Sequence, residues 1–174
     1  MRREIYRGRI VDLRVESVTL PNGTVVDLEL MHHIGAAAVV AADERERVVL
    51  IRQYRHAAGG FLWELPAGIL ASPDEAPETC AARELREEAG LVAARLRRLG
   101  AIFTTPGFCD ERIHLFLAEG LRDEGHRHEH DEVIAEITRV PLDEALAWIR
   151  SGTITDGKTI AGLHLAAATL GSAG

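Results

Sequence analysis

Residues 68–91, GILASPDEAPETCAARELREEAGL, decide the fold of this chain. From Ala81 onward the apolar residues recur at helical spacing as far as Ala89, and Gly90 follows in the position of a helix C-cap. The pattern predicts a glutamate-rich helix that runs from about Glu75 to Ala89.

Three carboxylates crowd one face of this predicted helix. At 100° per residue, Glu87 and Glu88 lie about 60° and about 40° to either side of Glu84. One interpretation is a solvated acidic face, partly neutralised by Arg83 at an i,i+4 distance from Glu87. The other is a site for a hard cation such as Mg²⁺, which prefers oxygen ligands.

The residues around the helix decide between the two interpretations. The fixed positions are Gly68, Glu75, Arg83-Glu84, Glu87-Glu88 and Gly90-Leu91. They resemble the Nudix box, which is written Gly-x5-Glu-x7-Arg-Glu-U-x-Glu-Glu-x-Gly-U with U apolar. Every fixed residue type is present, and chance produces such a match about once in a million sequences of average composition. The resemblance therefore favours metal-dependent chemistry on a diphosphate.

The chain departs from this box by one residue. Six residues, 69–74, separate Gly68 from Glu75 where the family usually has five. We place the extra residue in the loop around Ser72-Pro73, where an added residue costs little. The spacing within the helix is then intact. The insertion puts only the role of Glu75 in question.

The resemblance implies a catalytic metal centre. Glu84 and Glu88 are then metal ligands, Glu87 is a shared ligand or the residue that orients the attacking water, and the carbonyl of Ala67 completes the set. Arg83 steers Glu87 through a salt bridge. The implied cofactor is Mg²⁺, with Mn²⁺ as a substitute, because phosphoryl transfer is catalysed largely by positioning and charge neutralisation.

Motifs outside the box narrow the resemblance to the ADP-ribose pyrophosphatase branch of the family. They are Gly23, His33 with Gly35 and Ala36, Arg52-Gln53-Tyr54-Arg55, Glu64-Leu65-Pro66-Ala67-Gly68 and Pro106-Gly107-Phe108. That branch has a proline fifteen residues beyond the box, which Pro106 matches. The implied reaction is hydrolysis of ADP-ribose to AMP and ribose 5-phosphate.

The same resemblance suggests substrate contacts. Arg55, and more weakly Arg52, would contact the nucleotide or the diphosphate. Gly107 belongs to the motif around Pro106, and Glu111 would assist the metal or hold a ribose hydroxyl. The alternative for each arginine is an exposed strand end, and for Glu111 an ordinary turn carboxylate.

A loop carboxylate is a further candidate for the catalytic base. Parts of the family bring such a group in on a mobile loop, and the matching segment here is residues 129–132. Glu129 and Glu132 are the candidates. His130 stays open as an alternative, because an imidazole accepts a proton near neutral pH.

The remaining pattern predicts an α/β protein with a short β-rich N-terminal segment. A turn at Asn22-Gly23 between alternating runs predicts a β-hairpin within residues 1–34. Strands are expected at Ala36–Ala41, Val48–Tyr54, Leu96–Phe103, Ile113–Leu117 and Val133–Val140, and helices at Leu142–Ile149 and after Asp156. The order predicts mixed α/β layers. By resemblance, residues 35–174 form a Nudix hydrolase domain whose mixed sheet is sandwiched by helices.

Composition limits the classes of partner. The 174 residues, 47% hydrophobic, suit one core, and no run of eighteen apolar residues suggests a membrane span, so we expect a cytoplasmic protein. The net charge of −7 argues against nucleic acid and anionic membranes as partners. The expected partners are a nucleoside diphosphate sugar and, by resemblance, a second copy in a homodimer whose N-terminal segments help to hold the adenine.

Two other functions are compatible with these residues. The first is the same chemistry on GDP-mannose or another nucleoside diphosphate sugar, since base selectivity depends on contacts that the sequence does not locate. The second is a Nudix-like domain that binds a nucleotide sugar without turnover. All the box glutamates are present, which argues against the second.

Overall fold

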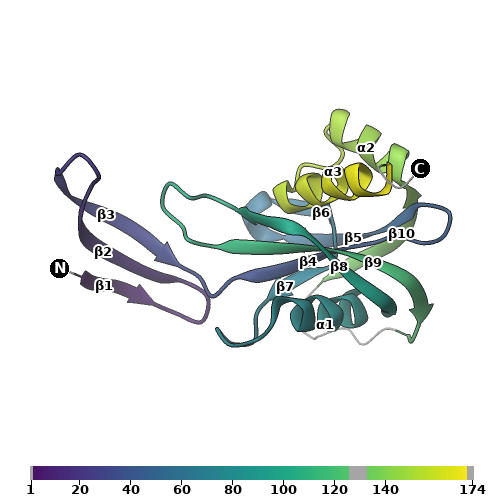
Figure 1. Cartoon of the computed structure of the whole chain (residues 1–174), viewed down its shortest axis with the longest axis horizontal. Coiled ribbons are helices and arrows are strands. Elements are labelled where there is room, and N and C mark those ends of the chain that lie inside the picture. Colours follow the sequence, from purple (N-terminus) through teal and green to yellow (C-terminus); the bar gives the residue numbers. More distant parts are fainter. Residues whose placement is uncertain (1, 126–132, 172–174) are drawn as a thin grey trace.

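The computed structural model describes residues 2–125 and 133–171, and consists of a body of two sheets and an N-terminal sheet that projects from one end (Figure 1). The N-terminal sheet has the order β1 (Arg2–Arg7), β2 (Asp12–Thr19) and β3 (Val25–His32). A four-stranded sheet has the order β7 (Ala67–Ile69), β4 (Ala36–Ala41), β9 (Arg112–Asp123) and β8 (Leu91–Phe103). A three-stranded sheet has the order β10 (Ile134–Pro141), β5 (Arg47–Arg55) and β6 (Gly60–Glu64).

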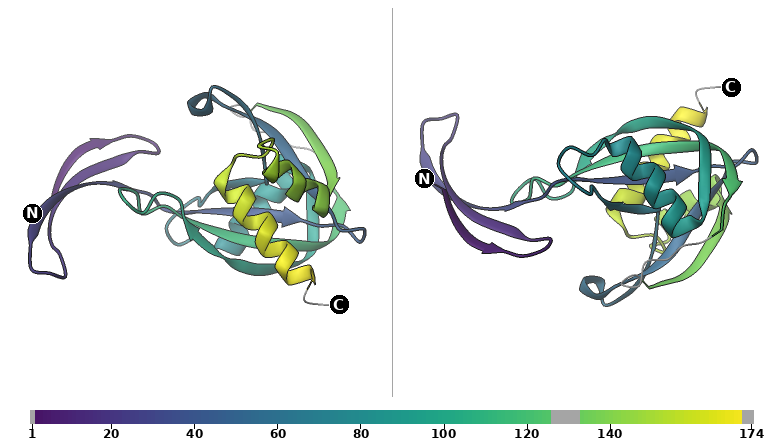
Figure 2. Two further views of the ribbon diagram at one scale, coloured as in Figure 1. Left: turned by 90° about the horizontal axis from the view of Figure 1, so that it is seen from above. Right: turned by 90° about the horizontal axis from the view of Figure 1, so that it is seen from below.

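Helices cover both faces of the body, as expected from the sequence. The helices are α1 (Pro77–Ala89), α2 (Leu142–Arg150) and α3 (Gly157–Gly171), with a short 3₁₀ helix, η1 (His56–Ala58). Helix α1 lies on one side of the sheets and α2 and α3 lie on the other (Figure 1, Figure 2). Strand β4 runs parallel to β9 and is buried along its whole length, with Val39 in the core that contains α1 and Val40 in the core that contains α3. The α/β sandwich of mixed sheet and helices that the sequence predicted is confirmed.

The glutamate-rich helix begins at Pro77, so the predicted start near Glu75 is wrong. The proline ring disfavours the helical conformation at the preceding residue, and Ala76 is accordingly extended, with φ −64° and ψ 129°. The end at Ala89 is as predicted. Gly90 adopts φ 66°, and its N–H donates to the carbonyl of Arg86. Glu75 therefore lies in the loop ahead of the helix.

The N-terminal sheet contains the predicted hairpin and one strand more. Gly23 N–H donates to the carbonyl of Leu20 at 2.8 Å in the turn between β2 and β3, and β1 pairs antiparallel with β2. None of the side chains described in these three strands is fully buried. The sheet joins the body through Met31, whose N–H donates to the carbonyl of Phe108 at 2.7 Å.

Besides β1, two short strands and two extensions were not predicted. Strand β7 places Ala67 beside Ala38 of β4, and β6 pairs with β5. Strands β8 and β9 form a pair that extends beyond the predicted strands, from Leu91 opposite Asp123 to the cavity described below. In the part of the chain that the structure describes, none of the helices has the length and apolar character that crossing a membrane requires.

Candidate active site

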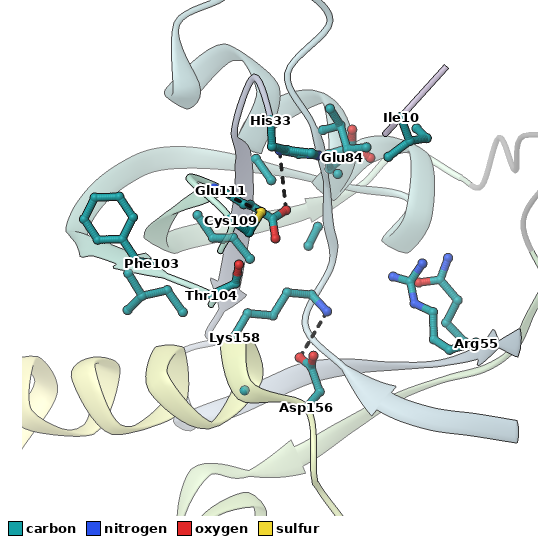
Figure 3. A pocket seen from close by; sticks show the side chains of 18 of the residues that line it. Ile10, His33, Arg55, Glu84, Phe103, Thr104, Cys109, Glu111, Asp156 and Lys158 are labelled. Atoms are coloured by element: carbon teal, nitrogen blue, oxygen red, sulfur yellow. Dashed lines mark hydrogen bonds and ion pairs between the residues drawn. The ribbon is translucent and has the colours of Figure 1, made fainter. Parts of the chain in front are cut away.

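A cavity of about 1170 Å³ lies between the base of the N-terminal sheet, α1 and the start of α3 (Figure 3). Strand β7 and α1 contribute Ala67, Gly68, Arg83, Glu84 and Glu87 to its wall. The cavity therefore contains most of the residues that the box assigns to the metal centre, together with residues from several other parts of the chain.

The three helix carboxylates differ in exposure. Glu84 and Glu88 are buried, with 8% and 1% of their surface exposed, and the side chain of Glu87 is 30% exposed. Glu88 Oε2 accepts a hydrogen bond from the backbone N–H of Ala67 at 2.7 Å. This bond fixes α1 to β7, the strand whose carbonyl is the fourth expected ligand.

Gly68 is required by the close approach of β7 to Glu84. A Cβ atom at position 68 would lie 2.1 Å from Glu84 Oε1 and 2.2 Å from its Cδ, so any side chain would displace the carboxylate. The glycine that opens the box is therefore explained by packing against the first of the helix glutamates.

Arg83 is the centre of the acidic cluster. Its guanidinium contacts Glu84 at 2.5 Å, Glu87 at 3.4 Å and Glu75 at 3.4 Å, and donates to the carbonyl of Ile69 at 3.1 Å. Burial alone would lower the pKa of Arg83, but the charge of Glu84 and the bond to Glu75 raise it well above its ordinary value. The predicted contact of Arg83 with Glu87 is present, as one of three.

The donor set suits a hard cation, although the side chains are arranged around Arg83. Among the residues described, no three His, Cys, Asp or Glu side chains are gathered in a way that would hold a metal ion. Glu84, Glu87, Glu88 and the Ala67 carbonyl nevertheless supply only oxygen atoms, which Mg²⁺ prefers. A carboxylate has two oxygen atoms, so Glu84 and Glu87 can contact Arg83 and a metal ion at the same time.

The candidate substrate residues divide into two groups. Arg55 and Glu111 line the cavity, whereas Arg52 and Gly107 do not. The guanidinium of Arg55 forms two hydrogen bonds of 2.9 Å with Glu64, and Glu111 Oε1 lies 3.6 Å from Nδ1 of His33. Figure 3 shows His33 and Glu111 facing each other across one side of the cavity.

Arg52 and Gly107 are exposed elsewhere. The Arg52 guanidinium lies 5.4 Å from the centre of the Phe61 ring, and Gly107 is in the loop between β8 and β9. The candidate bases Glu129, His130 and Glu132 lie outside the described residues.

Several cavity residues were not identified from the sequence. They are His33, Gln53, Asp156 and Lys158. The available signals were the polar residues of Arg52-Gln53-Tyr54-Arg55 and the run Asp156-Gly157-Lys158-Thr159 at the start of α3, which by itself predicts only a helix.

Comparison with known proteins assigns the family. The NUDIX domain description matches residues 31–162. The chain is 42% identical to an ADP-ribose pyrophosphatase of Mycobacterium tuberculosis, covering 91% of this chain and 77% of that protein. It is 40% identical to an ADP-ribose pyrophosphatase of Bacillus subtilis, covering 90% and 84% respectively. The chain therefore belongs to the Nudix hydrolase family, whose members generally depend on divalent metal ions.

Two further comparisons concern substrate range and fold. A GDP-mannose pyrophosphatase of Cronobacter sakazakii is 38% identical over 72% of this chain and 69% of its own length. A crystal structure of an ADP compounds hydrolase superposes with a TM-score of 0.85 at 21% identity, covering 100% of this chain and 94% of that one. At this level of identity the solved structure shows a shared fold alone, and the superposed region includes the N-terminal sheet.

Proposed function

We propose that this protein hydrolyses the diphosphate of ADP-ribose to AMP and ribose 5-phosphate, with Mg²⁺ as cofactor and Mn²⁺ as a substitute. The observation that carries the proposal is the presence in one cavity of the box residues Glu84 and Glu87 and the cation Arg55. The relatives named ADP-ribose pyrophosphatase support this choice of substrate.

Each residue has a task in the proposed reaction. Glu84, Glu87, Glu88 and the carbonyl of Ala67 would hold Mg²⁺, which would neutralise diphosphate charge and lower the pKa of bound water. Arg55 binds the diphosphate. Water attacks one phosphorus atom, the bond from that phosphorus to the bridging oxygen breaks, and the second phosphate leaves with the bridging oxygen.

The proton of the attacking water goes to a carboxylate. Glu87 is the candidate within the cavity, where Arg83 orients it, and Glu129 and Glu132 are the candidates from the loop. Alanine at a true base should lower kcat, because a base acts in the chemical step. Glu111 and His33 form the opposite side of the cavity, where a ribose hydroxyl can be bound.

GDP-mannose or another nucleoside diphosphate sugar is the second candidate substrate. The similarity to the Cronobacter sakazakii enzyme supports it. The chemistry at the diphosphate is the same, and the two substrates differ in the base and in the sugar. A panel of nucleotide sugars, assayed with product identification, separates the candidates.

We further propose a cytoplasmic homodimer in which residues 1–34 pack against the partner and residues 35–174 form the hydrolase domain. The N-terminal sheet exposes Ile5, Tyr6 and Val25, with 47%, 59% and 68% of their surfaces accessible. A small sheet is stable only when its apolar side chains pack against another element or chain. Exposed apolar residues on such a sheet are therefore typical of an interaction surface. The family match begins at residue 31, close to the proposed boundary.

The test is turnover of ADP-ribose by the purified protein in Mg²⁺ and in EDTA, with AMP and ribose 5-phosphate identified as products. We expect activity that EDTA abolishes. Glu88→Gln should lower kcat by about 10²–10³-fold with an unchanged circular dichroism spectrum, because it removes charge that stabilises the transition state. Full activity after chelation, or near-normal kcat in the variant, would contradict the proposed mechanism.

A further inference from the structure

Lys158 is the single lysine of the chain, all the other basic side chains apart from histidine being arginine. It lies in the first turn of α3, lines the cavity, and has only 12% of its side chain exposed. Figure 3 shows the side chain extending from the start of α3 into the cavity wall. Its ammonium group is compact and carries three donors, and it contacts two carboxylates, Glu64 and Asp156.

The partner of Lys158 is Glu64, at the end of β6. Glu64 is 1% exposed, and its Oε2 accepts hydrogen bonds from both Lys158 Nζ and Arg55. Burial alone would raise the pKa of Glu64, but Arg55 and Lys158 together hold it below its ordinary value. A buried carboxylate between two cations is therefore ionised, and both cations are oriented by it.

The first turn of α3 holds Lys158 in place. Asp156 Oδ2 lies 3.1 Å from Lys158 Nζ and accepts hydrogen bonds from the backbone N–H of Thr159 at 3.0 Å and from its hydroxyl at 2.6 Å. The Thr159 hydroxyl in turn accepts a bond from the N–H of Leu65 at 2.9 Å. This network fixes α3 to the segment that runs from Glu64 to β7.

The charges of the four groups in contact suggest why Lys158 is needed. Glu64, Asp156 and Arg55 alone sum to −1, which would oppose the approach of an anionic ligand to the cavity. Lys158, which contacts both carboxylates, brings the sum to zero and removes this net negative charge. Arg55, whose side chain is 39% exposed, is the member of the set best placed to meet that ligand, and Lys158 is the more buried.

We propose that Lys158 is a positioning residue, which acts through Glu64 to keep Arg55 oriented and its charge available for the substrate diphosphate. This inference rests on the proposed function. Two other roles are distinguishable from it. Lys158 would act independently of Glu64 if it contacted the substrate itself, and it would change stability without changing KM if it only supported the fold.

The experiment compares Lys158→Met with the double variant Lys158→Met/Glu64→Gln. Removing the lysine should raise KM about tenfold with little change in kcat, because Arg55 binds the diphosphate in ground and transition states alike. Adding Glu64→Gln removes the negative charge that Lys158 balanced and keeps an oxygen that can accept a hydrogen bond from Arg55, so it should return KM toward the wild-type value. Lys158→Arg, which keeps the charge, should retain a KM closer to wild type than Lys158→Met.

A control variant tests whether loss of any positive charge changes KM, and thermal melts of the variants measure the change in stability that a purely structural role would cause. Arg150→Met removes one positive charge at the exposed end of α2 and should leave KM unchanged. An unchanged KM in Lys158→Met, or a double variant no better than the single one, would overturn the proposal. If the wild-type protein hydrolysed no nucleotide sugar, the proposed function would fail and this inference with it. If the wild-type protein hydrolysed a different nucleotide sugar, the KM values of the variants would be compared for that substrate.

Discussion

Arg83 holds the acidic cluster together at the scale of single residues. Its contacts with Glu75, Glu84 and Glu87 neutralise carboxylates that would otherwise repel one another. Glu75 is tied further by a hydrogen bond from the N–H of Ala71 at 2.6 Å, and this bond, with Arg83, lowers its pKa. The insertion therefore leaves Glu75 in contact with the box, although outside the helix.

Gly68→Ala should weaken metal binding more than it weakens the fold. The added methyl would lie within 2.1 Å of Glu84 Oε1 and force this expected ligand out of place. We expect the apparent Kd for Mg²⁺, obtained by titrating activity, to rise about tenfold or more, a loss on the scale of a displaced hydrogen-bonded charge. Gly171→Ala at the end of α3, where a Cβ atom meets nothing within 4 Å, is the matched control. Equal Mg²⁺ affinity in the two variants would contradict this account of Gly68.

The first turn of α3 and the end of β6 work together at the scale of elements. Thr159, Asp156 and Lys158 connect the helix to Glu64 and Leu65, which are 94 residues away in the sequence. The Ala67 carbonyl and Gly68 follow directly after this anchored segment. The position of β7 against α1 is therefore set both by Glu88 and by the start of α3.

Glu64 should make stability depend on pH in the acidic range. Its pKa is lower in the folded chain than the ordinary value of 4.5, so the unfolded chain binds the proton more tightly. The contribution of Glu64 is then fully present above 4.5 and is lost as the pH falls through the lower folded value.

The measurement is the free energy of unfolding of wild type and Glu64→Gln between pH 7 and pH 3. We expect their difference to be largest near neutral pH and to shrink below 4.5. A constant difference across the range would mean that Arg55 and Lys158 do not stabilise the ionised form.

At the scale of the whole molecule, the parts that the sequence predicted are those set by local spacing. These parts depend on residues that are close in the chain: the face of α1, its Gly90 cap, the β2–β3 hairpin and the long strands. Most of the predicted first and last residues lie close to the observed ones. The contact of Lys158 with Glu64 was not predictable, because it depends on how two distant elements pack. The contact of Arg83 with Glu84 was equally inaccessible, since spacing fixes a face and not a side-chain direction, whereas the i,i+4 contact of Arg83 with Glu87 followed from the spacing.

The projecting N-terminal sheet leads to a prediction about assembly. If a second copy covers its apolar residues, placing a charge there should separate the subunits, because an unpartnered charge is costly in an apolar contact. Ile5→Asp should therefore convert a dimer to a monomer in light scattering after size exclusion, and Ile5→Val, which keeps the surface apolar, should remain dimeric. We also expect Ile5→Asp to raise KM, since the cavity includes Arg9, Ile10 and Met31 from this segment. A wild-type protein that is monomeric at micromolar concentration would refute the proposed dimer. If the Ile5→Asp variant remained dimeric, the contact between the subunits would lie on another part of the surface, away from Ile5.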